Sequence, residues 1–399
     1  MNALRPHLLS AVLVATVSLQ AADWPRWLGP NGDNRAPAAG KLPGDVSKWT
    51  VAWKADVGRG YAAIAVAGTR AYTLGHDGQG KETVVCLDAG SGAVVWRHSY
   101  PAELLPKMHG GGPNATPTIH GDRVLTVSKD GQVFCLGADK GNVVWQAKLT
   151  DLGLPLPQWG FGSSPVVDGS RVLLAAGRVV ALDLATGKSL WQSAEQHPGY
   201  ATAVPFRRGD RAFVAALDGK GLSVLTAEEG KEVVRRPFKA MFDVTASTPY
   251  VLEDGRKLFV SGNTSAELLE FDGTALNPVW ASTEVKTALN NAVLADGAIY
   301  AVDGRQGTAA RFVSVRLADG KVNWAHAGFG YGTVIGVGSE LLALTEGGEL
   351  VAVKASPESY QELGRQQVLG KTCWTTPVFA GDRIFVRNDR GEAVCLKAP

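Results

Sequence analysis

The sequence has few cysteines, no excess of either charge and no apolar run long enough to cross a membrane. Only four cysteines occur among 399 residues, and none lies in a C-x-x-C or Cys/His spacing typical of metal, haem or redox motifs. The net charge is +2 with acids and bases interspersed, so no basic stripe indicates a nucleic-acid partner. The apolar run at residues 8–19 has about 12 residues, whereas a transmembrane helix needs about 20. We therefore expect no nucleic-acid partner and no transmembrane segment.

This N-terminal run has the pattern of a secretory signal peptide. Arg5 precedes it and small residues follow it, which predicts cleavage near Ala21, a signal peptide at residues 1–21 and a periplasmic or secreted protein. A buried N-terminal helix is the alternative. No cysteine lies at the cleavage region, so a lipid anchor is not supported. Residues 22–48 are rich in Pro, Gly and Asn, which predicts an extended segment. Trp24 and Trp27 favour its packing on the folded domain over a plain tether.

An internal repeat determines the fold prediction. Similar segments end on an anchor residue, and the anchors are separated by 39 to 49 residues. Several short β runs per period of this length are typical of β-propellers. The anchors are Trp96, Trp145, Trp191, Val234, Trp280, Trp324 and Leu363.

Each unit reads as four antiparallel strands. A "TP" or "SP" pair opens the first strand, alternating apolar residues follow, and a glycine four residues before the anchor predicts a turn with positive φ. Those glycines are Gly92, Gly141, Gly187, Gly230 and Gly320. Cys86, Cys135 and Cys395 share one repeated position, which favours small core residues. A disulfide among the cysteines stays open at this stage.

The last unit has only three strands, and the missing one stands near the N-terminus. The sequence "WTVAWKADVG", residues 49–58, places Trp53 where the eighth anchor belongs. Pairing of this strand with the last unit closes the ring and removes its exposed edges. We therefore predict an all-β, eight-bladed propeller of four-stranded antiparallel blades over residues 49–399. We expect the six tryptophans Trp53, Trp96, Trp145, Trp191, Trp280 and Trp324 to be structural docking residues.

The segment "ALDLATGKSLW", Ala181 to Trp191, matches the tryptophan-docking motif A-x-D-x-x-T-G-K-x-x-W of quinoprotein dehydrogenases. With the opening "DWPRWLGPNGD" and the closing "CWTTPV", the chain resembles the secreted bacterial PQQ-like (pyrrolo-quinoline quinone) repeat proteins. The resemblance covers nearly the whole mature chain. It implies that each tryptophan packs between neighbouring blades and that the Asp and Thr of the motif fix the turn.

The resemblance points to two kinds of function. Quinoprotein dehydrogenases bind PQQ and Ca²⁺ over the propeller axis and use a catalytic Asp, whereas the assembly protein BamB is a propeller that binds protein partners without a cofactor. This chain lacks the adjacent cysteine pair of the alcohol dehydrogenases, a haem motif and long insertions. We therefore expect a non-catalytic scaffold for a protein partner or a small ligand, monomeric and without cofactor. A PQQ- and Ca²⁺-dependent dehydrogenase acting on alcohols or sugars, with Asp243 as base, is the alternative. A polymer-degrading role is a third possibility, although no paired carboxylates indicate it.

The loops between blades gather at one mouth of a propeller axis, and this mouth is where we expect the site. The candidate binding residues on these loops are Arg59, Tyr61, His109, Asn114, Gln158, Trp159, Tyr200, Asn290, Tyr331, Lys371 and Trp374. Two purely structural interpretations are the alternatives. Trp159 and Trp374 could simply plug the axis, and Asp243 and Asn290 could simply hydrogen-bond in turns.

Overall fold

The computed structural model describes residues 23–36, 41–107, 109–370 and 372–399. The predicted signal peptide and the candidate Lys371 lie outside the described residues. The described part contains no helix that is both long enough and apolar enough to span a bilayer. Its helical elements are the 3-10 turns η1 (Val46–Lys48) and η2 (Met241–Asp243).

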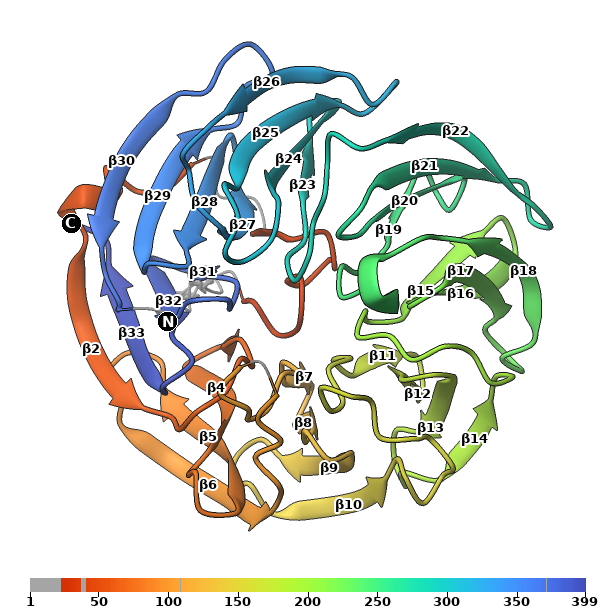
Figure 1. The fold of residues 1–399 in the computed structure, drawn as a ribbon. Coiled ribbons are helices and arrows are strands. Elements are labelled where there is room, and N and C mark those ends of the chain that lie inside the picture. Colours follow the sequence, from red (N-terminus) through yellow and green to blue (C-terminus); the bar gives the residue numbers. More distant parts are fainter. Residues whose placement is uncertain (1–22, 37–40, 108, 371) are drawn as a thin grey trace, which may run out of the picture.

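The described strands form eight sheets around a common axis (Figure 1). Blade 1 has β3 (Ala65–Ala67), β4 (Arg70–His76), β5 (Lys81–Asp88) and β6 (Val94–Pro101); blade 2 has β7 (Thr118–His120), β8 (Arg123–Val127), β9 (Gln132–Gly137) and β10 (Val143–Lys148). Blade 3 has β11 (Val166–Asp168), β12 (Arg171–Ala175), β13 (Val179–Asp183) and β14 (Ser189–Gln192); blade 4 has β15 (Val204–Arg208), β16 (Arg211–Asp218), β17 (Gly221–Thr226) and β18 (Glu232–Pro237).

Blade 5 has β19 (Tyr250–Leu252), β20 (Lys257–Ser261), β21 (Ala266–Phe271) and β22 (Leu276–Ser282); blade 6 has β23 (Val293–Ala295), β24 (Ala298–Asp303), β25 (Arg311–Arg316) and β26 (Val322–His326). Blade 7 has β27 (Gly332–Val337), β28 (Glu340–Thr345), β29 (Glu349–Lys354) and β30 (Glu362–Gln367), with β1 (Arg35–Ala36) added in parallel to β27. Blade 8 has β31 (Val378–Ala380), β32 (Arg383–Arg387), β33 (Glu392–Lys397) and β2 (Thr50–Asp56). The eight-bladed antiparallel propeller predicted from the repeat is confirmed.

The ring is closed by the N-terminal strand, as predicted. Strand β2 pairs antiparallel with β33, the last strand of the chain, and places Trp53 opposite Cys395. Arg387 of β32 adds a second link from blade 8 to blade 1. Its buried guanidinium donates to the carbonyl oxygens of Ala62, Leu74 and Gly58 at 2.7 to 3.1 Å. Burial lowers the pKa of Arg387 to about 10, so the link is made by a charge held by neutral acceptors.

Each docking tryptophan joins its own blade to the next. The indole N–H donates to a backbone carbonyl of the following blade, as Trp145 does to Leu184 at 2.8 Å and Trp53 does to Ala89 at 3.0 Å. For five of the six tryptophans the ring lies against the turn glycine of that blade, and a Cβ on Gly187 would come within 2.5 Å of the Trp145 ring. Burying an indole of roughly 200 Å² at about 25 cal/mol per Å² gives at most about 5 kcal/mol for each tryptophan.

The turns beneath the tryptophans have the predicted geometry. The five glycines that precede the anchors all have positive φ, between 66° and 73°. In the turn after β13, the carboxylate of Asp183 accepts hydrogen bonds from the backbone N–H and the hydroxyl of Thr186. These bonds lower the pKa of Asp183 below its ordinary value. The Asp and Thr of the repeat therefore fix the turn, as the resemblance implies.

The two blades without an anchor tryptophan are joined to their neighbours by other groups. After blade 4, where Val234 stands at the anchor, Arg211 donates to the Gly273 carbonyl of blade 5 at 3.2 Å. Next to blade 7, the turn between β33 and β2 does not exist, because β2 comes from the other end of the chain. The 3-10 turn η1 takes that place, with Val46 and Trp49 buried, and a Cβ on Gly364 would meet Asp45 at 2.2 Å.

A chain of hydrogen bonds runs around the axis through the residues that open the first strands. A side-chain oxygen from one blade accepts the backbone N–H at the corresponding position of the preceding blade, over 2.9 to 3.4 Å. The bonds run from Ala63 to Thr116, Thr116 to Ser164, Ser164 to Thr202, Thr202 to Thr248 and Thr248 to Asn291. The repeated "TP" and "SP" pairs therefore begin with a hydroxyl because that hydroxyl satisfies a buried donor.

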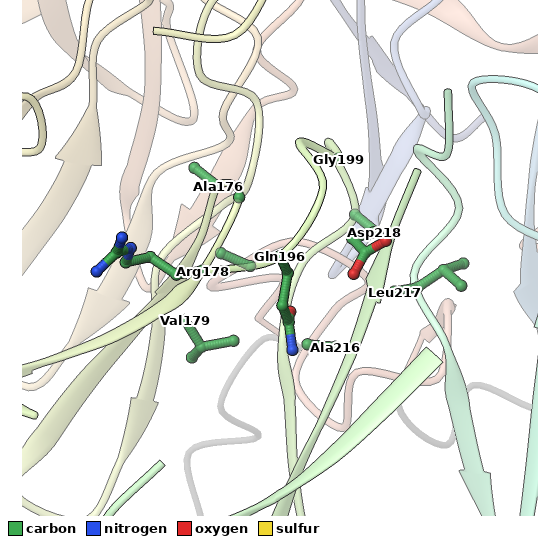
Figure 2. Close-up of a pocket in the computed structure, with 11 residues that line it drawn as sticks. Ala176, Arg178, Val179, Gln196, Gly199, Ala216, Leu217 and Asp218 are labelled. Atoms are coloured by element: carbon green, nitrogen blue, oxygen red, sulfur yellow. The ribbon is translucent and has the colours of Figure 1, made fainter. Parts of the chain in front are cut away.

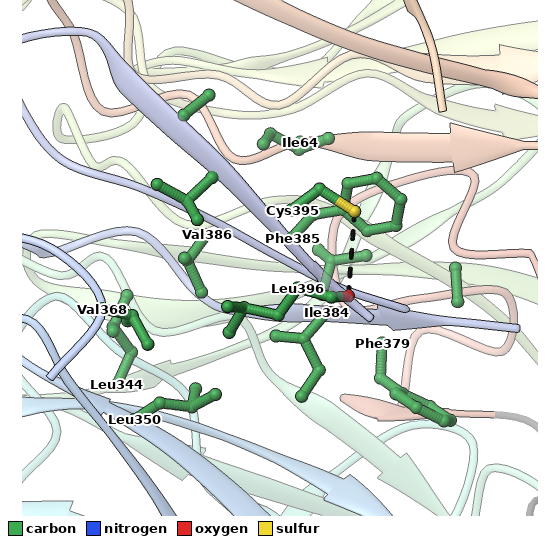
Figure 3. Packing of buried hydrophobic residues seen from close by; sticks show 14 of the residues in the cluster. Ile64, Leu344, Leu350, Val368, Phe379, Ile384, Phe385, Val386, Cys395 and Leu396 are labelled. Carbon is green, nitrogen blue, oxygen red and sulfur yellow. Dashed lines mark hydrogen bonds between the residues drawn. The ribbon is translucent and has the colours of Figure 1, made fainter. Parts of the chain in front are cut away.

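The core lies between blades, where alternate residues of each sheet pack against the next sheet. Figure 3 shows this packing around blade 8, with Phe385 and Cys395 beside Ile64 of blade 1. All four cysteines are buried and unpaired. The three that share a repeated position are core residues, as the sequence predicts.

The N-terminal residues 23–36 cross the end of the axis at which the first and second strands of the blades turn (Figure 1, red). Trp24 exchanges backbone hydrogen bonds with Val66 of blade 1. Trp27 donates to Thr248 of blade 5 at 2.9 Å, and Arg35 donates to carbonyl oxygens beside β23 and β27. This segment therefore ties together blades that are not neighbours in the ring.

Replacing Trp53 by Ala should destabilise the propeller by about 3–5 kcal/mol, because a large buried ring is removed at the closing joint. Val51→Ala on the same strand is the control, since Val51 is 47% exposed and its truncation should change stability by about 0.5 kcal/mol or less. Urea unfolding, followed by far-ultraviolet circular dichroism instead of tryptophan fluorescence, measures the stability of both variants. Equal effects of the two substitutions would show that Trp53 does not hold the joint.

Two glycines of blade 3 separate backbone strain from close packing. Gly187 and Gly169 have φ values of 72° and 59°, but a Cβ on Gly169 meets nothing within 4 Å. Gly169→Ala should cost about 1 kcal/mol, from the left-handed conformation alone. Gly187→Ala should cost a further 1–3 kcal/mol or so, because the methyl group would displace Trp145. Matching midpoints of chemical denaturation for the two variants would contradict this account of docking.

Candidate functional site

The mouth opposite the N-terminal segment is formed by the loops between blades and by the turns between second and third strands. Tyr61, on the loop into blade 1, stacks on Trp374, on the loop into blade 8, with ring centroids 5.3 Å apart and planes at 21°. The edge of His109, from the loop into blade 2, packs on Tyr61 at 5.2 Å. The Trp374 indole donates to Glu346 at 2.7 Å. Three loops are thus joined by aromatic contacts, and one carboxylate orients the outermost indole.

A second aromatic pair continues this wall. Trp159 lies 5.8 Å from Tyr200, on the next loop, and the Tyr200 hydroxyl accepts the Trp159 backbone N–H. Asn114 donates to the Trp159 carbonyl at 3.2 Å. We call Trp374, Tyr61, His109, Trp159, Tyr200 and Phe242 the aromatic arc; these residues lie on successive loops from blade 8 to blade 5. Arg59 and Gln158 are exposed beside it.

Phe242 is the most exposed member of the arc, and it lies on a loop that the sequence assigns to the mouth. Its side chain is 81% exposed, and both Phe242 and Asp243 have positive φ, at 60° and 53°. A bulky residue in this conformation costs about 1–2 kcal/mol, which the free chain does not recover through burial of the ring. Only a glycine preference could have indicated such a backbone from sequence, and the residue present is Phe.

The other half of the mouth is structural. Asn290 is fully buried and donates to the carbonyl oxygens of Val302 and Gly332. The buried hydroxyl of Tyr331 accepts the Leu289 N–H at 3.1 Å. Their polar groups join blades 6 and 7, and Tyr331 also belongs to the buried cluster against which Trp374 of the arc packs.

Asp243 lies at the surface beside one histidine and one lysine. Its carboxylate lies 3.7 Å from both His197 Nε2 and Lys220 Nζ. A Ca²⁺ site needs several oxygen ligands directed at one point. Within the described ranges no group of three or more His, Cys, Asp or Glu side chains is placed to hold a metal. The surroundings of Asp243 therefore do not fit a Ca²⁺-bound cofactor.

A buried ionisable cluster lies beneath the loops that carry His109 and Trp159. Lys129 and Glu82 are both fully buried. Glu82 accepts hydrogen bonds from the Lys129 backbone N–H and the Tyr100 hydroxyl, at 3.1 Å each. Burial raises the pKa of Glu82 to about 7 and lowers the pKa of Lys129 to about 8. Sequence reasoning missed this cluster, because a lysine in the turn "SKDG" ordinarily points into solvent.

Two hollows lie outside the arc. One of about 10 Å³ between blades 3 and 4, beside Gln196 and Asp218, has room for about one water (Figure 2). Asp218 there is already paired with Arg235 at 2.7 Å. An open cleft of about 450 Å³ on blade 8 is lined by charged side chains, among which Lys54 and Glu392 pair at 3.2 Å. Neither hollow brings together the predicted site residues.

Sequence comparisons place the chain among repeat propellers. A model of the family described as "Outer membrane protein assembly factor BamB" matches residues 44–203 and 175–330. The BamB of Burkholderia pseudomallei is 26% identical over 248 residues, which cover 57% of this chain and 58% of that protein. Quinohemoprotein alcohol dehydrogenase ADH IIB of Pseudomonas putida is 28% identical over 141 residues, 31% of this chain and 20% of that enzyme. Each of these matches spans less than two thirds of the relative's length.

Solved structures show the same fold at low identity. BamB from Moraxella catarrhalis superposes with a TM-score of 0.62 at 15% identity, covering 88% of this chain and 98% of that one. Quinohemoprotein alcohol dehydrogenase from Comamonas testosteroni superposes with a TM-score of 0.74 at 13% identity, covering 94% and 80%. The propeller is common to an outer membrane protein assembly factor and an alcohol dehydrogenase, so the fold alone does not identify the function.

The raised pKa of Glu82 predicts how stability depends on pH. Between pH 4.5 and about 7 the folded state binds more protons at Glu82 than the unfolded state, so the free energy of unfolding should fall as pH rises. Glu82→Gln removes this dependence. The difference in free energy of unfolding between the wild type and this variant should change by on the order of 3 kcal/mol across the pH window. The lowered pKa of His109 acts in the opposite direction, but in both proteins. Parallel stability curves from denaturant titrations at several pH values would contradict a buried, protonated Glu82.

Proposed function

The chain belongs to the family described as outer membrane protein assembly factor BamB, and from that premise we propose that it is an exported, non-catalytic binding scaffold. Its ligand is a protein partner or a small molecule, and it binds at the loop-lined mouth of the axis. The N-terminal apolar run supports export to the periplasm or beyond the cell. We propose that the scaffold acts as a monomer.

The aromatic arc is the observation that carries this proposal. Binding sites enrich partly exposed aromatic side chains that are held by a rigid frame and set beside a few polar groups. Tyr61, Trp159 and Tyr200 are partly buried, so their rings are already positioned, while Phe242 projects into solvent. A strained backbone that presents an exposed ring is a feature found where binding compensates for the strain. The polar groups of Asn290 and Tyr331, by contrast, hold blades together.

A PQQ-dependent dehydrogenase is the second candidate, favoured by the likeness to quinohemoprotein alcohol dehydrogenases. The donor groups around Asp243 argue against it, since a carboxylate that faces His197 and Lys220 is not gathered with other oxygen ligands. We therefore derive no reaction through this cofactor, and we propose that the chain has no resident cofactor.

Calorimetric titration of the mature chain with PQQ, with and without Ca²⁺, separates the two candidates. The scaffold proposal predicts no saturable heat, and no reduction of a dye acceptor with a panel of alcohols and sugars. Tight, Ca²⁺-dependent binding accompanied by dye reduction would overturn it in favour of the dehydrogenase.

Phe242→Gly tests the arc itself. Glycine adopts positive φ without strain, so the variant should be as stable as the parent or about 1 kcal/mol more stable. The amount of binding partner that this variant retains should nevertheless fall at least about tenfold, as expected when an exposed aromatic contact is removed. Val143→Ala is the matched control, since Val143 is 42% exposed on the outer strand β10. Retention of the same partners from a periplasmic extract by all three proteins would place binding outside the arc.

A further inference from the structure

Lys129 is a buried cation without a partner. It lies in the turn between β8 and β9, its side chain is fully buried, and its Nζ finds no hydrogen-bond partner among the described residues. An ammonium group carries three donors, and burying it unpaired is costly. Buried lysines are therefore ordinarily matched by a carboxylate or by several carbonyl oxygens.

The neighbouring acids do not supply that match. The charge of Glu82 is near enough to favour that of Lys129, but among the described residues no carboxylate oxygen lies within hydrogen-bond distance of the Lys129 Nζ. Asp130 accepts from the Ser128 hydroxyl and from the Gln132 side chain. A structural ion pair is thus not what keeps a lysine at this position.

The side chain of Lys129 lies under the loop that carries Trp159. A Cβ on Gly160 would come within 2.5 Å of Lys129 Cγ and 3.1 Å of Cε, so only glycine allows the loop to lie this close. The Lys129 carbonyl accepts the Phe161 N–H at 2.9 Å. The charged group is therefore tied to the same loop that supplies the central member of the aromatic arc.

His109 provides a second donor near Lys129, whose charge it senses. Its Nδ1 accepts the Gly111 N–H at 3.1 Å, which leaves Nε2 as the protonated nitrogen. Burial, with a contribution from the charge of Lys129, lowers the pKa of His109 to about 4. At neutral pH the ring is thus an uncharged donor close to an ammonium group, which is an arrangement suited to receive an anion.

We propose that Lys129, assisted by His109, is the receptor for an anionic group, a carboxylate or a phosphate, on the ligand that binds at the mouth. This inference rests on the proposed function, because it assigns a charge to the ligand of the same site. The anion would supply the acceptors that the ammonium group lacks, and the aromatic arc would hold the rest of the ligand.

Thermal unfolding with small anions tests the proposal. Acetate, benzoate and inorganic phosphate are titrated separately at constant ionic strength into the wild-type chain, Lys129→Met and Lys220→Met. Lys220 is a matched control, because it is an exposed lysine of the same mouth. We expect a saturable rise in the wild-type melting temperature with the carboxylates or with phosphate, and whichever series acts identifies the group. The Lys220→Met protein should respond alike.

The Lys129→Met variant should show two changes of opposite sense. Without anions it should melt at a higher temperature than the wild type, because an unpaired buried charge has been removed. With anions it should show no further rise. A lower melting temperature without anions, a retained anion response, or no response in the wild type would each overturn the proposal.

A second measurement uses the wild-type chain alone and does not depend on how the variant folds. Because the pKa of Lys129 is about 8, anion affinity should weaken about 15-fold between pH 8 and 9.5, whereas binding to exposed lysines should persist. The ionisable groups near Lys129 are Glu82, His109 and the adjacent Asp130; above pH 8 Glu82 stays largely ionised and His109 stays uncharged. Unchanged affinity at pH 9.5 would contradict the proposal. If partner retention still depends on Phe242 in that case, the anion-receptor proposal is rejected and the scaffold proposal is retained.

Discussion

The propeller depends on one non-covalent joint, the pairing of β2 with β33. The strands of blades 1 to 6 follow one another in the chain, as do the four antiparallel strands of blade 7, but blade 8 is assembled from both ends. Strand β2 can therefore pair only after β33 has been synthesised. Trp53 and Arg387 both attach this assembled blade 8 to blade 1, at the carbonyl oxygens of Ala89 and Ala62. Any chain that ends before β33 would leave two unpaired sheet edges, which are surfaces that promote aggregation.

Around the rest of the ring, two kinds of contact repeat at different radii. The docking tryptophans act at the outside of the blades, and the hydroxyl chain through Thr116, Ser164 and Thr202 acts near the axis. Both satisfy a buried polar group of one blade with an atom of the next, so neighbouring blades cannot separate without losing hydrogen bonds and apolar burial together. Where the sequence lacks the tryptophan, an arginine or the η1 turn occupies the space.

The fold could be predicted from the sequence because each packing position recurs, so the role assigned to a residue in one repeat can be compared with the other repeats. The tryptophans, the turn glycines and the closing strand were all predicted in this way. The site was less readable, because burial at the mouth depends on loops that do not repeat. Asn290 and Tyr331 lie at the mouth but are buried between blades, and Lys129 has the sequence context of a surface lysine but is covered by Gly160. No pattern in the sequence reports the strained backbone of Phe242.

The N-terminal residues that cross the far end of the axis give the ring a direction. Trp24, Trp27 and Arg35 attach this segment to blades on opposite sides, and Asn34 is buried among the carbonyl oxygens of blades 6 and 7. The two ends of the axis therefore differ: one is crossed by a segment that joins distant blades, and the other, the aromatic mouth, is formed by the loops between blades.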